Sequence, residues 1–213
     1  MFSKFLNALA GTRLYPITDR RLSGLSHAEQ VSQLSEAGAT LIQLREKSFS
    51  AREFYSEAEQ ALRVARTRGI KIIINDRIDI ALALQADGVH LGQDDVPPEA
   101  ARRLLGPNAI IGFSTHNLEQ ARQAAKMPLD YVALGPIFAT ATKENADSSI
   151  GIEGLQLARR AVGRLPVVAI GGITFANSLD VLAAGSHAVA VIADIWCPHG
   201  QAITHTQRLL HHT

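Results

Sequence analysis

The sequence has one cysteine, few aromatic residues and no long apolar run. Cys197 is the only cysteine among the 213 residues, so the chain cannot form an internal disulfide. No apolar stretch approaches the roughly 20 residues that a membrane helix needs, and the apolar stretch at residues 1–6 is too short for a secretion signal. These absences argue against a secreted disulfide scaffold and a membrane protein, and we expect the protein in the cytoplasm.

An excess of charge of one sign is also lacking. The 21 basic and 20 acidic residues give a formal net charge of +1, so no overall field attracts nucleic acid or an anionic membrane. Any anion site must therefore be local. With 46% apolar and 19% charged residues, the chain has the composition of one globular domain spanning residues 1–213.

Eight short β-branched runs alternate with Ala- and Leu-rich segments that carry charges at helical spacing. The helical segments include residues 51–69, 98–106 and 117–126, and several end in glycine, a favourable residue after a helix. The expected strands are residues 14–19, 40–46, 71–76, 88–92, 110–114, 131–138, 166–172 and 188–195.

This regular alternation predicts an α/β fold, a single-domain (β/α)8 TIM barrel. Dividing 213 residues among eight units gives about 27 residues per unit, near the low end for this barrel, whose typical length is ~250 residues. Residues 1–11 precede the first strand as an N-terminal extension. A doubly wound open sheet is the alternative, but such a sheet usually has fewer strands and gives no reason for eight even repeats.

Polar residues end most of the apolar strands. A TIM barrel places its active site at the C-terminal strand ends, so these residues are site candidates, although each alone is also typical of a helix cap or a solvated loop. Gln43, Arg45 and Lys47 share one side of their strand because side chains alternate between faces. Two cations on that side suit a polyanion such as phosphate or pyrophosphate.

Two later loops carry further signs of phosphate binding. Lys143 follows the sequence Thr-Ala-Thr and adds a cation to a hydroxyl-rich loop. Gly171 and Gly172 end the seventh strand, where this fold often binds phosphate through backbone N–H groups. Thr174 follows them as an expected helix N-cap.

Asp76 and Asp95 follow the third and fourth strands, which are neighbours in a barrel. Two carboxylates together with phosphate oxygens and water are a typical set of Mg²⁺ ligands. The alternative is that Asp76 pairs with Arg77 or caps the next helix, and that Asp94 or Asp95 caps the helix after the two prolines. The cations nearby favour metal-bound pyrophosphate.

Six motifs together resemble one enzyme family, thiamine phosphate synthase (thiamine-phosphate pyrophosphorylase). They are LIQLREK, IINDR, ADGVHLGQDD, IGFSTH, DYVALGPIFATATK and PVVAIGGI, and they follow the family's order and approximate spacing from about residue 12 to residue 195. The resemblance implies a (β/α)8 barrel and a transferase activity. An enzyme of this family joins a hydroxymethylpyrimidine diphosphate to a thiazole phosphate and releases pyrophosphate. The reaction passes through a pyrimidine cation, with Mg²⁺ as cofactor.

The resemblance also implies roles for matched positions. Asp76 and Asp95 match the Mg²⁺ ligands. The diphosphate and pyrimidine site matches Gln43, Leu44, Arg45, Glu46, Lys47, Asn75 and Ser114. The thiazole phosphate site matches Thr140, Ala141, Thr142, Gly172, Ile192 and Ala193, and Lys143 matches the lysine that reaches the leaving group. Catalysis is therefore expected from Arg45, Lys47, Ser114 and Lys143, with no protein nucleophile.

This chain departs from the family pattern at two positions. Ala139 precedes Thr140 where the family commonly has proline, and Ala193 stands where serine is common. A backbone N–H contact to phosphate at Ala193 would tolerate this change.

Three alternatives stay open on the sequence. A related thiazole tautomerase shares the barrel, but such relatives tend to lack the two aspartates and the Thr-x-Thr-Lys loop found here. Another phosphate-handling barrel, such as a sugar-phosphate epimerase, would need a paired acid and base. A non-catalytic protein would bind thiazole phosphate without releasing pyrophosphate. The sequence does not reveal a homo-oligomer, although the apolar segment around Trp196 could cover a barrel end or a subunit contact.

Overall fold

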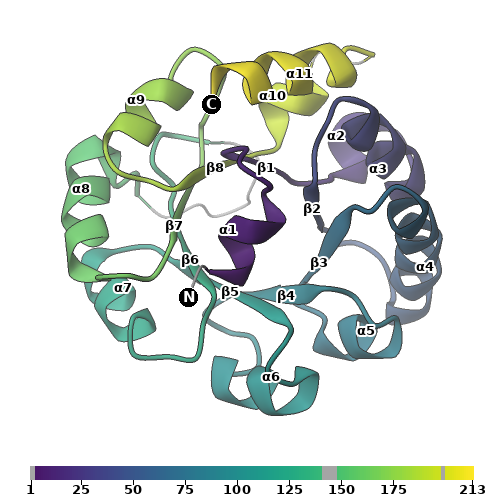
Figure 1. Ribbon diagram of the computed structural model, residues 1–213, viewed down its shortest axis with the longest axis horizontal. Coiled ribbons are helices and arrows are strands. Elements are labelled where there is room, and N and C mark those ends of the chain that lie inside the picture. The colour runs from purple at the N-terminus through teal and green to yellow at the C-terminus, as the bar shows by residue number, and fades with distance from the viewer. Residues whose placement is uncertain (1–2, 141–147, 198–199) are drawn as a thin grey trace.

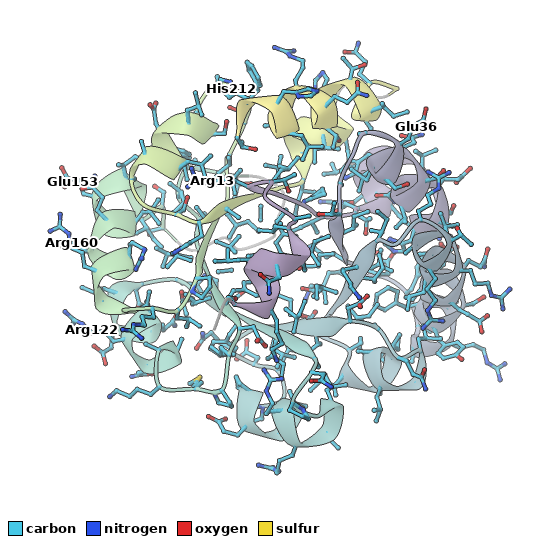
Figure 2. The ribbon with its side chains drawn as sticks, in the orientation of Figure 1. Arg13, Glu36, Arg122, Glu153, Arg160 and His212 are labelled. Atoms are coloured by element: carbon cyan, nitrogen blue, oxygen red, sulfur yellow. The ribbon has the colours of Figure 1, made fainter. Side chains whose placement is uncertain are left out.

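The eight strands form one parallel sheet that curls into a nearly closed barrel (Figure 1). The computed structural model describes residues 3–140, 148–197 and 200–213. The strand order is β1-β8-β7-β6-β5-β4-β3-β2, and a bridge between Ile17 and Gln43 links the two ends of the sheet. The predicted barrel is therefore confirmed. The strands are β1 Leu14–Pro16, β2 Leu41–Leu44, β3 Lys71–Asn75, β4 Gly88–Leu91, β5 Ile110–Thr115, β6 Tyr131–Leu134, β7 Val167–Ile170 and β8 Ala188–Val191.

Helices surround the barrel as an outer ring (Figure 1). Two of them begin with a capping box, in which Ser26 and Glu29, or Ser50 and Glu53, exchange side-chain and backbone hydrogen bonds. The helices are α1 Lys4–Ala8, α2 Arg20–Ser23, α3 His27–Glu36, α4 Ala51–Thr67, α5 Ile78–Ala83, α6 Pro98–Leu105, α7 Leu118–Ala124, α8 Gly151–Ala161, α9 Ser178–Ala183, α10 Ala193–Trp196 and α11 Ala202–His212.

Alternation along the strands divides the core into two layers. On β3, Ile72 and Ile74 face outward into the larger layer between strands and helices, whereas Ile73 faces the barrel interior. The same alternation sends Gln43 and Asn75 toward the inside, because they lie two residues from Leu41 and Ile73. A strand can therefore be buried on both faces and still deliver a polar side chain to the mouth of the barrel.

Helix α1 crosses the N-terminal end of the barrel (Figure 1). The Phe5 ring is fully buried and stacks on Tyr131 with ring centroids 4.1 Å apart. The Lys4 ammonium donates to the carbonyls of Pro107 and Ala109 at 2.6 and 3.0 Å. This part of the N-terminal extension fills the floor of the barrel, so a ligand can enter the barrel from the opposite mouth.

Two local predictions were wrong. The strand expected over 188–195 ends at Val191, and the chain turns at once into α10. Thr174 does not cap a helix; α9 starts at Ser178, and Asn177 instead accepts a hydrogen bond from the Thr174 N–H at 2.8 Å.

Trp196 is 2% exposed and donates its indole N–H to the Ile17 carbonyl at 2.9 Å, so its side chain packs within the chain, just beyond β1. Within the described ranges, every helix is too short or too polar to cross a membrane.

Candidate active site

The cations predicted after β2 lie at the C-terminal mouth, and each faces a carboxylate. Arg45 donates to Asp19 at 3.0 Å, and Asp19 also accepts from the Leu22 N–H at the start of α2. The Lys47 ammonium pairs with the carboxylate of Asp76 across the gap between the β2 and β3 loops. The positive charge of the mouth is therefore held in ion pairs, and a phosphate group can compete for both cations.

Asp76 and Asp95 converge as predicted. The backbone of Asp76 has a φ of 62°, an unusual value for a non-glycine residue, and its N–H donates to the His90 carbonyl at 2.8 Å. Asp95 accepts the Gly92 N–H at 2.6 Å. Burial raises the pKa of Asp95, and the nearby charge of Asp76 and a hydrogen bond with it raise that pKa further.

The alternative roles for these aspartates, an ion pair with Arg77 or a helix cap, are wrong. Arg77 pairs with Asp79, with its Nε 2.8 Å from the carboxylate, and not with Asp76. Neither Asp94 nor Asp95 caps α6, because Pro97 occupies the position before the helix. Asp76 instead pairs with Lys47, and Asp95 accepts the Gly92 N–H, so both carboxylates stay at the mouth of the barrel.

The donor set fits a magnesium ion. Two like charges held side by side in a half-buried place repel each other, as the raised pKa of Asp95 reflects, and a divalent cation would relieve that repulsion. In the described part of the chain, no group of three or more His, Cys, Asp and Glu side chains converges. An ion here would take its remaining ligands from phosphate oxygens and water, as Mg²⁺ commonly does.

A chain of hydrogen bonds runs through the barrel interior below the mouth. Gln43 donates to the Tyr15 hydroxyl at 3.1 Å, and the Tyr15 and Tyr131 hydroxyls are 3.1 Å apart. Next, His90 bonds the Tyr131 hydroxyl through Nδ1 and the Ser114 hydroxyl through Nε2, each at 2.8 Å. The chain therefore fixes Gln43 and Ser114, two predicted substrate contacts, from beneath.

Burial keeps this chain neutral. It lowers the pKa of His90 to about 4 and raises the pKa of both Tyr15 and Tyr131 above their usual value. The imidazole of His90, buried in the barrel interior, therefore serves as an uncharged hydrogen-bonding group at neutral pH.

Asn75 reaches the same interior space from the end of β3. It is 6% exposed, and its Nδ2 has no hydrogen-bond partner among the described residues. A buried amide group without a partner is costly. This donor is therefore suited to a ligand acceptor at the mouth.

Two residues of the predicted diphosphate site point elsewhere. The Leu44 side chain is fully buried in the outer core layer, so only its backbone borders the mouth. Glu46 turns back on its own loop and accepts the N–H groups of Lys47 and Ser48, both at 2.8 Å. Glu46 thus shapes the loop that carries Lys47.

The loops after β6 and β7 approach each other closely. The Phe138 N–H donates to the Gly171 carbonyl at 3.0 Å. Gly172 has a φ of 64°, and Thr140 lies on the neighbouring loop after β6. A Cβ at Gly172 would lie 2.6 Å from the Ala139 carbonyl, so only glycine fits there. Ile192 and the exposed Ala193 follow β8 at the same mouth. The predicted Ala141, Thr142 and Lys143 lie outside the described residues.

The sequence reasoning missed Tyr15 and Tyr131. One indication was present: Gly112 lies in the middle of β5, and a Cβ there would come within 2.0 Å of the Tyr131 ring. A glycine inside a buried strand often marks the close approach of a neighbour. Here that neighbour is the tyrosine at the centre of the hydrogen-bond chain.

Known proteins with the same sequence pattern and fold are thiamine phosphate enzymes. Residues 14–195 match the family described as thiamine monophosphate synthase. The thiamine-phosphate synthase of Chloroflexus aurantiacus is 47% identical over 184 residues, covering 86% of this chain and 84% of that protein. The corresponding protein of Clostridium novyi is also 47% identical, covering 86% and 90%.

A solved structure agrees. The thiamine phosphate pyrophosphorylase from Pyrococcus furiosus superposes with a TM-score of 0.85 at 38% identity, covering 98% of this chain and 96% of that one. A 3-hexulose-6-phosphate synthase, at 16% identity and a TM-score of 0.72, shares the fold alone. The family match and these relatives together show that the chain belongs to the thiamine monophosphate synthase family.

Proposed function

We propose that the C-terminal mouth of the barrel is where this thiamine-phosphate synthase, a transferase, joins its pyrimidine and thiazole substrates. The observation that carries this proposal is the convergence of Arg45, Lys47, Asp76 and Asp95 above a buried neutral hydrogen-bond chain. In a chain of this family, that arrangement is suited to a diphosphate leaving group held beside a pyrimidine ring.

The charged residues act on the departing pyrophosphate. The bond that breaks joins the pyrimidine methylene carbon to a diphosphate oxygen, and the electron pair leaves with pyrophosphate. Arg45 and Lys47 neutralise the charge that develops, and Lys143 is assigned the same task by its place in the motif. Mg²⁺ held by Asp76 and Asp95 would supply further charge neutralisation on the diphosphate.

The interior residues hold the pyrimidine. Ser114, fixed by His90, and the buried amide of Asn75 would bond the ring edge, while Gln43 lies at the same depth. Electron release from the aminopyrimidine stabilises the cation left after pyrophosphate departs, and the thiazole nitrogen then donates its electron pair to form the new C–N bond. The protein supplies orientation, and no covalent intermediate with a side chain is required.

The second substrate takes the opposite side of the mouth. Thr140, Gly172 and the backbone at Ile192 and Ala193 would hold the phosphate of the thiazole, with Ala141 and Thr142 as further contacts from the motif. The close approach of the β6 and β7 loops supports this assignment, because backbone N–H groups can reach an anion there.

Release of pyrophosphate tests the proposal directly. Purified protein is given the pyrimidine diphosphate, the thiazole phosphate or both, with Mg²⁺ and then with excess EDTA. We expect thiamine phosphate and pyrophosphate only with both substrates and the metal. A folded protein that releases no pyrophosphate under any of these conditions would contradict the proposed function and favour the tautomerase or a binding role.

We also place the enzyme in the cytoplasm, with small molecules as its substrates. The single cysteine, Cys197, is free and exposed, which suits a reducing compartment. The sequence leaves open whether the protein is a monomer or a homo-oligomer, and sedimentation of the purified protein would decide between them.

A further inference from the structure

A buried histidine outside the substrate mouth supports both cations of the β2 loop. His27 opens α3 and is completely buried, beside the equally buried Thr18 that follows β1. Its backbone N–H donates to Glu57 at 3.2 Å, so the helix start is fixed in place independently of the ring. The imidazole is therefore not needed to hold the helix start, and its two nitrogens face Thr18 and Glu46.

One ring nitrogen connects to Arg45. The His27 Nδ1 lies 2.8 Å from the Thr18 hydroxyl, and that hydroxyl accepts the Arg45 backbone N–H at 3.2 Å. Thr18 also donates its own N–H to the Gln43 carbonyl at 2.9 Å. Thr18 thus holds the main chain of the segment from Gln43 to Lys47 by two hydrogen bonds, one at Gln43 and one at Arg45.

The other ring nitrogen faces Glu46. The distance from His27 Nε2 to the Glu46 carboxylate is 3.7 Å, too long for a hydrogen bond, and Nε2 has no hydrogen-bond partner among the described residues. The Thr18 hydroxyl accepts from Arg45 and can donate its own hydrogen to Nδ1, and in that tautomer the ring hydrogen is on Nε2 and faces the Glu46 carboxylate. Glu46 in turn accepts the Lys47 N–H at 2.8 Å.

We infer that His27 is a positioning residue that sets the main chain of the Arg45–Lys47 segment through its hydrogen bond to Thr18, while its other ring nitrogen faces the Glu46 carboxylate that holds the Lys47 N–H. This inference rests on the proposed function only in taking that segment as the diphosphate-binding one. His27 itself touches neither phosphate nor metal ligand, so its loss should weaken diphosphate binding and leave the thiazole phosphate site unchanged.

Paired variants test the inference. His27→Asn keeps a polar group near the Nδ1 position and loses the one near Nε2, whereas His27→Gln does the reverse. Thr18→Val removes only the hydroxyl, and Thr206→Val is a matched control, because Thr206 is equally buried and its hydroxyl has no partner among the described residues. Binding of inorganic pyrophosphate with Mg²⁺ is measured by titration calorimetry, beside the KM for each substrate and the melting temperature.

Thr18→Val and His27→Gln should each weaken pyrophosphate binding by about five- to tenfold, the value of one hydrogen bond, with the KM for thiazole phosphate unchanged. His27→Asn should retain more of the affinity, and the double variant Thr18→Val/His27→Gln should lose little more than either single one. Thr206→Val should bind pyrophosphate as the wild type does. If His27→Gln fails to fold, Thr18→Val tests the same chain.

Wild-type affinity in both Thr18→Val and His27→Gln would overturn the inference, as would equal losses for both substrates, which indicate a general structural role. Since pyrophosphate binding needs no turnover, this result is independent of whether the wild type makes thiamine phosphate. Failure of the proposed function would appear in the wild-type assay alone.

Discussion

The two halves of the barrel mouth are built from different chemistry. The segments after β1 to β4 carry the ion pairs Arg45–Asp19 and Lys47–Asp76, with Asp95 beside Asp76. The described loops after β5 to β8 contribute hydroxyls, glycines and backbone, at Ser114, Thr140, Gly171, Gly172 and Ala193. A charged half thus faces a largely neutral half.

The difference shows how one mouth can tell two phosphate esters apart. In the charged half, each cation already has a carboxylate partner, so a diphosphate must arrive with its own cation or displace a carboxylate. In the neutral half, close backbone approach at Gly172 selects by shape and by N–H groups. Changes to the two halves should therefore fail in different ways.

The largest effect is expected from the aspartates of the charged half. Asp76→Ala and Asp95→Ala should each lower Mg²⁺-dependent turnover by at least about a thousandfold, since the loss removes a metal ligand and the charge compensation of the leaving group. Pyrophosphate release over a range of Mg²⁺ concentrations measures this loss. Asp94→Ala is the matched control, as an exposed neighbour on the same loop, and should keep full activity. Full activity in either of the first two variants would contradict the metal assignment.

Lys143→Ala should have the next largest effect. The lysine is predicted to meet the leaving group from the neutral side, so its loss should slow pyrophosphate departure by about a hundredfold, the scale of one lost transition-state contact. Single-turnover kinetics separates that step from thiazole phosphate binding, which should change less. Lys126→Ala, at an exposed lysine after α7, is the control. A variant that only weakens thiazole phosphate binding would assign Lys143 to the thiazole phosphate and contradict its role at the leaving group.

Gly172→Ala should affect only the neutral half. The new Cβ would lie 2.6 Å from the Ala139 carbonyl, so the β6 and β7 loops must separate, and we expect the KM for thiazole phosphate to rise about tenfold. Gly163→Ala has the same backbone strain, at a φ of 63° against 64°, but its Cβ would meet nothing within 4 Å. Both variants should lose about 1 kcal/mol of stability, so a KM change in Gly172→Ala alone isolates the contact. Equal KM values in the two would contradict the assignment of this loop.

The sequence predicts the barrel well because its evidence is periodic. Each strand is buried on both faces, as in β3 with Ile72, Ile73 and Ile74, and an unbroken apolar run followed by a helix repeats eight times. Strand ends were less certain. The run at 188–195 continues as an apolar segment beyond Val191, but residues 193–196 form a helix because the chain must turn away from the barrel mouth.

The site was predictable only where a residue type implies a chemistry. Asp76, Asp95 and Lys47 were found because carboxylates and cations after strands suggest metal and phosphate. Tyr15 and Tyr131 were not, since their roles depend on which side chains the closed barrel brings together. Those contacts join residues far apart in the chain, such as Tyr15 and Tyr131, and no local pattern reports them.

The smallest effect is expected at the seam between the halves, where His90 on β4 bonds Ser114 on β5. Burial lowers the pKa of His90 from 6.5 to about 4, so the unfolded chain takes up a proton at a pH where the folded protein does not. Stability should therefore fall as the pH falls from 6.5 toward 4, and the loss between about pH 7.5 and pH 5.5 should be about 1 kcal/mol. Urea unfolding at a series of pH values measures it.

His90→Asn distinguishes this histidine from the others. Burial also lowers the pKa of His27 and His187, so the wild-type slope has contributions of the same sign from all three. The variant should be less stable at every pH, because Tyr131 and Ser114 lose their hydrogen-bond partner. Between pH 7.5 and pH 5.5, however, it should lose about 1 kcal/mol less stability than the wild type loses. An unchanged slope in His90→Asn would mean that the imidazole is not held neutral, and a charged group would then join the two halves of the mouth.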